Sequence, residues 1–381
     1  MTTPLSRRRF TGLSLAASAS AIIPGGALAS SPEVEILDTK IVSPQANYYH
    51  GWPTLTRTEK GELIAVWSGR REAHVCPFGT VEMMSSRDGG ETWTFPRTVH
   101  DGPIDDRDAG VLQTANGTLI VTTFTSLAYG PQIAEGGSKA NDAAWKSAHN
   151  RIVDEETREG ELGTWCFRSN DGGLSFSGRI DTIVNSPHGP CQLADGRILY
   201  VGKELWTDEK RIGASVSSDD GETWEWLADI PTRPGDKARE YHELHAVQCK
   251  SGKIIAQIRN HNETNKGETL QTESNDGGKT WSMPHSIGVW GLPSHLLRLK
   301  DGRLLMTYGH RRKPFGNQAR FSADEGATWS EPAIVSGDGI GGDLGYPSTV
   351  EMDDGSFVSL WYEKLADSPM AQLRQARWKV K

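Results

Sequence analysis

A short polar phrase, S-x-D-x-G-x-x-[WF], occurs five times in this chain and constrains its fold more than any other feature. Its copies begin at Ser86, Ser169, Ser217, Ser274 and Ser322. The Ser and Asp side chains of such a phrase can bond nearby backbone N–H groups, Gly supplies a positive φ, and the aromatic residue packs onto a neighbouring strand. We therefore interpret the phrase as a structural turn and not as a catalytic motif.

A second repeat runs out of phase with the first. Six apolar segments each pass through a turn into another apolar segment, and the turn glycines are Gly61, Gly117, Gly196, Gly252, Gly302 and Gly355. Each segment is typical of a β-hairpin. The glycines are 50 to 79 residues apart, and a period of this size with about four strands per unit predicts an all-β, six-bladed β-propeller.

The polar turns then lie between the third and fourth strands of the first five blades. The early run at residues 34–42 is expected to join the last blade and close the ring. The longest interval, between Gly117 and Gly196, leaves room for an insertion at about residues 127–163, part of which has a helical pattern. Such an insertion is either a functional lid or a plain surface excursion.

The N-terminus has the order of an export signal. Arg7, Arg8 and Arg9 precede a short apolar run and then Ala27-Leu28-Ala29, in a pattern that resembles a twin-arginine signal. The apolar run is too short to span a membrane, so we expect no stable membrane insertion. Residues 1–29 are predicted to be cleaved, leaving a single propeller over residues 30–381 that is periplasmic or secreted.

Charge and cysteine content narrow the classes of partner. The net charge of −8 gives a nucleic acid no overall electrostatic reason to bind. The four cysteines, at positions 76, 166, 191 and 249, form no C-x-x-C pair, so we expect buried thiols rather than a zinc site. We predict no cofactor and no resident metal.

The first strand of each propeller blade lines the central axis, and its starting end opens onto the face where ligands bind. Five of these six positions carry His or a carboxylate and the sixth carries Tyr; the residues are His50, Asp108, His188, Glu243, His245, His295 and Tyr346. Buried polar groups cost free energy unless they meet a partner or a ligand. Arginines follow the second strands, at Arg70-Arg71, Arg259 and Arg311-Arg312, which favours a pocket for an anionic substrate.

Five such turns on a six-bladed pattern resemble the sialidase (neuraminidase) superfamily, whose hallmark is this Asp box, over about residues 34–381. The resemblance implies a glycosidase with a Tyr nucleophile polarised by a Glu, an Asp acid/base and three arginines that grip a substrate carboxylate. It assigns the nucleophile to Tyr346, its partner to Glu243 and the middle arginine to Arg259. Trp361-Tyr362-Glu363 resembles a family motif whose Glu orients an arginine.

The chain departs from the family pattern in three places. Gly51-Trp52-Pro53 stands where the family has its first arginine, and residues 71–79 contain no Asp at the place of the acid/base. The candidates for the third arginine are Arg312 and Arg320, and neither is in register with the family pattern. Proton donation then falls to Asp108, Glu72 or His74.

The sequence therefore favours an exported, sialidase-like glycoside hydrolase acting on an anionic or complex glycan. Its predicted catalytic residues are Tyr346, Glu243 and Asp108, and its predicted substrate-binding residues are Arg71, His74, His188, His245, Arg259, His295, Arg312 and Glu363. Two alternatives stay open. The many histidines suit a polysaccharide lyase with a His or Tyr base, of which a His-lined metal site is a variant, and the departures suit a glycan-binding propeller without turnover.

Overall fold

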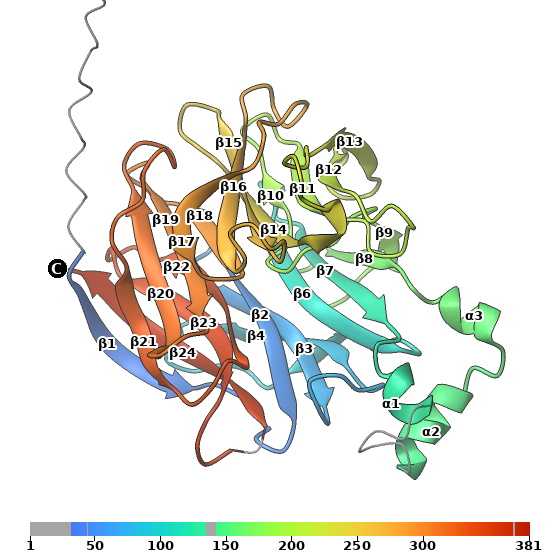
Figure 1. The fold of residues 1–381 in the computed structure, drawn as a ribbon. Coiled ribbons are helices and arrows are strands. Elements are labelled where there is room, and N and C mark those ends of the chain that lie inside the picture. Colours follow the sequence, from blue (N-terminus) through green and yellow to red (C-terminus); the bar gives the residue numbers. More distant parts are fainter. Residues whose placement is uncertain (1–31, 44, 135–141, 369) are drawn as a thin grey trace, which may run out of the picture.

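A computed structural model describes residues 32–43, 45–134, 142–368 and 370–381. Its strands form six four-stranded antiparallel sheets, each following the previous one along the chain and arranged around one axis (Figure 1). The prediction of an all-β, six-bladed propeller is confirmed. We number the blades 1 to 6 in chain order, starting from β2.

The strands of the first three blades have the following bounds. Blade 1 contains β2 (Tyr49–Arg57), β3 (Leu63–Arg71), β4 (Thr80–Ser86) and β5 (Arg97–His100); blade 2 contains β6 (Asp105–Gln113), β7 (Leu119–Ser126), β8 (Thr164–Ser169) and β9 (Ile180–Asp181); blade 3 contains β10 (Cys191–Gln192), β11 (Ile198–Lys203), β12 (Ile212–Ser217) and β13 (Glu225–Asp229). The second strands are buried almost throughout, as in β3 and β11, because neighbouring blades cover both of their faces.

The remaining blades repeat the pattern. Blade 4 contains β14 (Tyr241–Gln248), β15 (Ile254–Asn260), β16 (Glu268–Ser274) and β17 (His285–Trp290); blade 5 contains β18 (Ser294–Arg298), β19 (Leu304–His310), β20 (Phe315–Ser322) and β21 (Ala333–Gly339); blade 6 contains β22 (Leu344–Glu351), β23 (Phe357–Lys364), β24 (Ala371–Val380) and β1 (Val34–Ile41). A short 3-10 helix, η1 (Ala238–Glu240), precedes β14.

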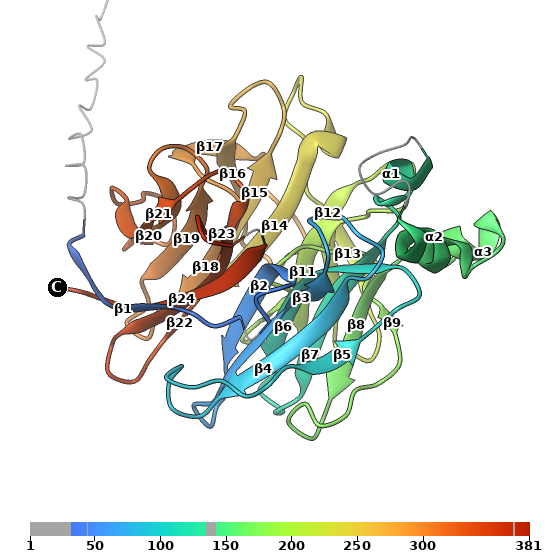
Figure 2. The same cartoon turned by 90° about the horizontal axis from the view of Figure 1, so that it is seen from below.

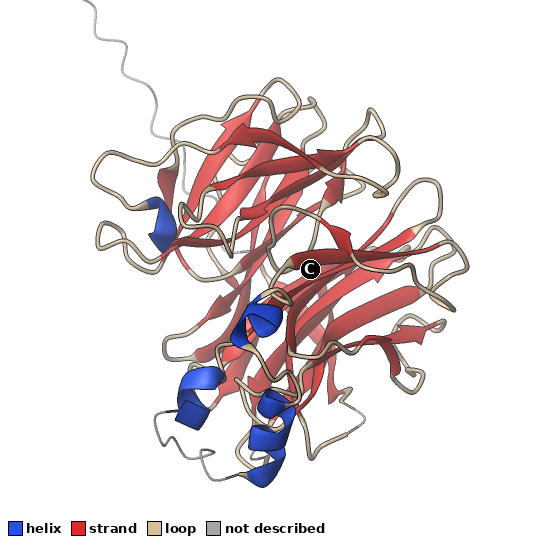
Figure 3. Ribbon diagram, turned by 90° about the vertical axis from the view of Figure 1, so that its right-hand side faces the viewer, coloured by secondary structure: helices blue, strands red, loops and turns tan. Residues whose placement is uncertain are grey.

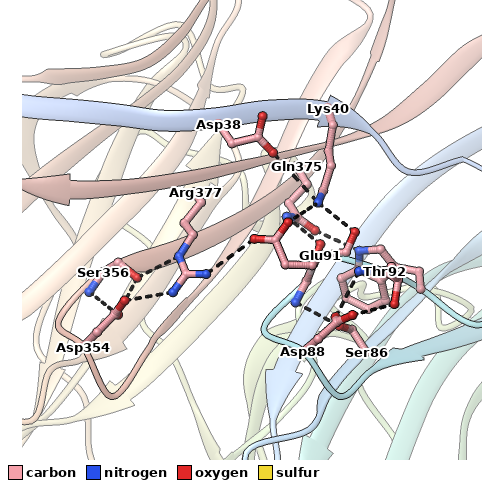
Figure 4. Close-up of polar contacts among 12 residues, drawn as sticks. Asp38, Lys40, Ser86, Asp88, Glu91, Thr92, Asp354, Ser356, Gln375 and Arg377 are labelled. Atoms are coloured by element: carbon pink, nitrogen blue, oxygen red, sulfur yellow. Dashed lines mark hydrogen bonds and ion pairs between the residues drawn. The ribbon is translucent and has the colours of Figure 1, made fainter.

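The ring closes as predicted, because β1 from the N-terminal side pairs antiparallel with β24 from the C-terminal end. Figure 1 shows the blue strand lying beside the red one. Ion pairs at the rim of this closure run from Lys40 and Arg377 to Glu91, at 3.6 and 3.7 Å (Figure 4). Since exposed pairs contribute little, the backbone ladder between β1 and β24 is the main link.

The polar turns are structural, as the sequence predicts. In the first copy, the Ser86 hydroxyl donates to Asp88 and accepts from the Gly90 N–H, at 2.7 and 2.8 Å. Asp88 also accepts from the backbone and hydroxyl of Thr92, at 2.9 and 2.6 Å (Figure 4). Because Ser86 pairs with Leu63 at the start of β3, the turn lies at the opposite end of the blade from Tyr49, the first residue of β2.

The insertion predicted at residues 127–163 contains α1 (Gly130–Ala134), α2 (Ala143–Asn150) and α3 (Glu155–Glu159), with residues 135–141 outside the described part. It lies between β7 and β8, and Figures 2 and 3 show its helices gathered at one margin of the ring. Asp142 caps α2 by accepting from the backbone N–H of Ala144 at 2.9 Å. Trp145 on α2 is buried against Cys76 of blade 1, so the insertion supports the loop that contains Cys76.

The predicted export signal lies outside the described residues and stays a prediction. In the part of the chain that the structure describes, no helix is long and apolar enough to cross a membrane. All four cysteines are free thiols; three are buried, and Cys191 is half-buried.

Candidate active site

Three predicted residues meet at the axis. The Tyr346 hydroxyl, on β22, donates to Glu243 Oε1 at 2.6 Å. Arg259 Nη1, on β15, lies 2.9 and 2.8 Å from the two oxygens of Glu243 on β14, and 3.1 Å from the Tyr346 hydroxyl. Blades 4 and 6 therefore contribute a hydrogen-bonded Tyr–Glu–Arg triad.

Irregular backbone turns side chains towards the axis at the starting ends of the first strands. Four non-glycine residues there have positive φ: Trp52 (55°), Asp108 (48°), His188 (73°) and Tyr346 (54°). In β2, β6 and β22 the register shifts at this same point, as a bulge requires. Positive φ at a bulky residue is strained, and such strain clusters at functional sites.

The triad has a defined charge distribution. Burial alone would raise the pKa of Glu243, but the Arg259 guanidinium overcomes this and lowers it to about 2. Burial raises the pKa of Tyr346 well above its ordinary value, and the charge of Glu243 raises it further. Glu243 is therefore ionised. The Tyr346 hydroxyl keeps its proton, which points at Glu243.

A second cation lies beside Tyr346. The guanidinium carbon of Arg311 is 5.8 Å from the centre of the Tyr346 ring, and Arg311 Nε donates to the Leu344 carbonyl at 3.0 Å. The guanidinium of Arg107 lies over Trp52 at 4.5 Å. Arg259 and Arg311 thus flank the tyrosine and can bind an anionic group.

Asp108 lies at the axis and is 7% exposed. Burial raises its pKa to about 7. The charge of Arg107 lowers this pKa, and the charge of Glu243 raises it. Asp108 therefore carries a proton over much of the pH range below neutrality.

The predicted histidines His188, His245 and His295 do reach the axis. They lie on the side of Tyr346 that faces the hairpin turns. The rings of His245 and His295 stack at 4.7 Å, and His188 lies 6.2 Å from the Tyr346 ring. All three line a cavity of ≈ 370 Å³ whose walls include Arg57 and Glu351, at the hairpin-turn ends of their strands. This cavity opens on the opposite face, which corrects their assignment as substrate-binding residues.

Burial lowers the pKa of all three histidines, so they are neutral near pH 7. His245 Nδ1 accepts the Leu296 N–H at 2.9 Å, which places the ring proton on Nε2.

Comparison with known proteins agrees with this architecture. A sequence profile of the BNR repeat-like domain matches residues 149–358, more than half of the chain. The chain belongs to the BNR repeat-like domain family. Among curated proteins, this BNR propeller is 23% identical over 342 residues to a sialidase of Bacteroides fragilis, covering 82% of the chain and 59% of that relative. It is 23% identical over 290 residues to a sialidase of Micromonospora viridifaciens, covering 74% of the chain and 36% of that relative.

The BNR propeller thus spans less than two thirds of these relatives. Among solved structures it resembles a protein of unknown function from Dyadobacter fermentans, with a TM-score of 0.73, 22% identity and coverage of 92% and 100% of the two chains. A sialidase of Streptococcus pneumoniae gives a TM-score of 0.62 at 15% identity, covering 91% of this chain and 70% of the other. The fold is that of the sialidase superfamily.

Three predicted substrate-binding residues of the BNR propeller are instead structural, and two of them are buried. Arg71 is 0% exposed and forms a bidentate pair with Asp105 at 2.6 and 2.9 Å. Glu363 is fully buried and accepts from Trp361 Nε1 at 2.8 Å and from Arg374 at 2.5 Å. Burial and internal partners therefore keep both away from a substrate.

Arg312 is the third correction. Its guanidinium stacks on Trp290 at 3.6 Å, and its neighbour Arg311 is the one beside Tyr346. The other arginine considered for this role, Arg320, donates to Tyr308 and to the Ser330 carbonyl within blade 5.

Sequence reasoning missed an aromatic wall next to Tyr346. Trp52, Tyr49 and Tyr362 have ring centres 6.0 Å from one another, and Tyr362 lies 5.8 Å from Tyr346. Gly51 stands where the family pattern has an arginine and Trp52 follows it, so the departure at Gly51-Trp52-Pro53 was the available signal. Within the described residues, no group of three or more potential ligands is arranged to hold a metal ion.

Because the axial histidines are buried, we expect the free energy of unfolding to depend on pH. Burial lowers the pKa of His245 from 6.5 to about 3, so between these values the unfolded chain binds one more proton at this residue than the folded one. Stability then rises with pH across this window by about 1.4 kcal/mol per pH unit for one such group. We expect His245→Asn, whose amide oxygen can still accept the Leu296 N–H, to reduce the slope of unfolding free energy against pH by about one proton.

Urea unfolding of both proteins at several pH values between 4 and 8 measures this slope. Above pH 7 the two slopes should coincide, which provides an internal control. Parallel slopes from pH 4 to 6 would contradict the assignment of a neutral, buried His245.

Proposed function

We propose that this protein is a retaining glycosidase that hydrolyses α-glycosides of an anionic sugar of the sialic acid class. The observation that carries the proposal is the triad at the axis, in which the Tyr346 hydroxyl points at Glu243 Oε1 at 2.6 Å beside the Arg259 guanidinium. That curated relatives are sialidases supports the sugar class.

The chemistry follows from the charges of the triad. Tyr346 attacks the anomeric carbon while its proton passes to Glu243, which is ionised and already bonded to it. A glycosyl-tyrosine forms, and water then releases the sugar as Glu243 returns the proton to Tyr346. A neutral tyrosine suits an anionic sugar because a carboxylate nucleophile would be repelled by the charge of the substrate.

Two cations define where that charge would lie. Glu243 and Tyr346 bond to Nη1 of Arg259, and Nε donates to His261 at 2.9 Å. Nη2 has no hydrogen-bond partner among the described residues and can bind a ligand. Arg311 approaches Tyr346 from the adjacent blade. A carboxylate between these groups would hold the anomeric carbon next to the Tyr346 oxygen.

Covalent trapping tests the proposal. We expect the purified protein to release methylumbelliferone from 4-methylumbelliferyl α-N-acetylneuraminide and to be inactivated by 2,3-difluoro-N-acetylneuraminic acid, because fluorine next to the anomeric carbon slows breakdown of the glycosyl-enzyme. Mass spectrometry should find one added sugar on the peptide that contains Tyr346. The Tyr346→Phe variant should take up no label. Undiminished turnover by that variant, or a label on another residue, would refute the nucleophile.

A further inference from the structure

Cleavage of a glycosidic bond also needs a proton for the departing oxygen. The donor has to face the solvent side of the site, where the leaving group departs. Tyr346 and Glu243 are occupied with each other, and Asp108 is almost fully buried. His74 differs from these groups, since 47% of its side chain is exposed.

We propose that His74, held by Asp343 and Tyr49, is the proton donor to the leaving group, an inference that rests on the proposed glycosidase function. His74 belongs to the loop between β3 and β4, on the face of the ring that carries Tyr346. Its ring meets the edge of Trp52 at 5.0 Å, and Trp52 lies 6.5 Å from Tyr346. Trp52 therefore packs against both rings.

The hydrogen bonds fix the protonation pattern of His74. The Tyr49 hydroxyl donates to Asp343 Oδ1 at 2.8 Å. With its own proton used in this way, the Tyr49 oxygen can only accept from His74 Nδ1, which is 2.7 Å away. Nδ1 also lies 3.2 Å from Asp343 Oδ1. Nδ1 is therefore the donor in these contacts, which leaves Nε2 as the atom that can exchange a proton with a substrate.

Asp343 is held as an ionised carboxylate beside the His74 ring. Burial alone would raise its pKa, but hydrogen bonds from His74 and Tyr49 and the charge of Lys364 hold the pKa well below its ordinary value. Tyr362 approaches the same oxygen at 3.2 Å. The resulting carboxylate orients the ring. For Nε2, no hydrogen-bond partner occurs among the described residues, which leaves it available to a substrate.

The backbone of His74 is held as firmly as its side chain. Arg71 Nη2 donates to the His74 carbonyl at 3.0 Å, and the same guanidinium is fixed by Asp105. Two residues earlier, Glu72 accepts from Trp145 Nε1 of the insertion at 2.7 Å. The insertion and the Arg71–Asp105 pair are therefore positioning elements for this loop.

The proposed step balances. As Tyr346 attacks, the bonding electrons of the anomeric C–O bond pass to the leaving oxygen, which takes the proton from His74 Nε2. Neutral His74 then removes a proton from the water that attacks the glycosyl-tyrosine, and this restores the imidazolium. The proton that Tyr346 gave to Glu243 returns to the tyrosine oxygen in the same step.

Leaving-group dependence tests the proposal. We expect His74→Ala to lower kcat/KM for 3′-sialyllactose, which releases a poor leaving group, by about 10²- to 10⁴-fold. For 4-methylumbelliferyl α-N-acetylneuraminide, which releases a good one, kcat/KM should fall less than tenfold. Added azide should restore kcat on the aryl substrate and yield a glycosyl azide, because azide attacks the glycosyl-enzyme without a general base.

Two further variants separate catalysis from structure. His74→Gln, which keeps the size of the side chain, should show the same contrast if the alanine variant fails to fold. Asp108→Asn should lower kcat/KM for both substrates by a similar factor and should not respond to azide. Equal losses on both substrates for the His74 variants would overturn the inference alone. A wild-type protein that cleaves neither substrate would overturn the proposed function and the inference with it.

Discussion

Replacing Glu243 by glutamine is expected to lower kcat/KM by about 10²- to 10⁴-fold, the range for removal of a positioned general base. The glutamine would keep the size of the side chain and could still bond the Tyr346 hydroxyl, but an amide cannot take up the proton. Steady-state kinetics on 4-methylumbelliferyl α-N-acetylneuraminide measures the loss. The matched control is Glu240→Gln, because Glu240 lies in η1, three residues earlier, and its side chain is 40% exposed; its rate should stay at the wild-type value.

A double-mutant cycle sharpens this prediction. Tyr346→Phe removes the nucleophile, and residues that act as one unit show non-additive losses. The variant with both substitutions should therefore be no slower than Tyr346→Phe alone. Additive losses in ΔΔG‡ would mean that Glu243 acts on something other than Tyr346.

Replacing Arg71 by methionine is expected to destabilise the protein by about 3–5 kcal/mol, the cost of removing one partner of a buried ion pair. Asp105 would be left with its charge at zero exposure, and the His74 carbonyl would lose its donor. Urea unfolding monitored by tryptophan fluorescence gives the change in unfolding free energy.

The exposed pair of Arg303 and Asp301 provides the comparison. Arg303→Met should give no resolvable change, because surface ion pairs contribute little. Adding Asp105→Leu to Arg71→Met should recover part of the lost stability by removing a buried charge that keeps only Arg107, 4.0 Å away, as an ion-pair partner among the described residues. A double variant less stable than Arg71→Met would show that Asp105 has a role beyond this pair.

The six-bladed ring and the positions of the triad residues could be predicted from the sequence for the same reason. The turn glycines mark equivalent points in each blade, so Tyr346 and Glu243 could be placed at matching positions on strands although they lie 103 residues apart. Periodicity placed these residues at the axis because the fold repeats one unit, and the family resemblance supplied their roles. Arg259 was found in the same way, at the end of a second strand.

No repeat governs the remaining site residues, so the sequence left His74 as one of three candidate proton donors and did not indicate Asp343. His74 and Asp343 lie in loops 269 residues apart in sequence, and each loop occurs in one blade only. The sequence also did not indicate how far along the axis each of these side chains lies. Positive φ at His188 and Tyr346 rotates side chains in a way that residue type does not indicate, so the histidines behind the tyrosine looked equivalent to the groups in front of it.

The closure of the ring has a consequence for when the proposed active site is complete. The hydrogen bond between Tyr49 and Asp343 spans 294 residues and joins blade 1 to the start of blade 6, next to the pairing of β1 with β24. A nascent chain cannot assemble this junction until its last blade has left the ribosome. On the proposed function, turnover would report completed folding, and a chain cut before blade 6 should be catalytically silent even where its earlier blades are intact.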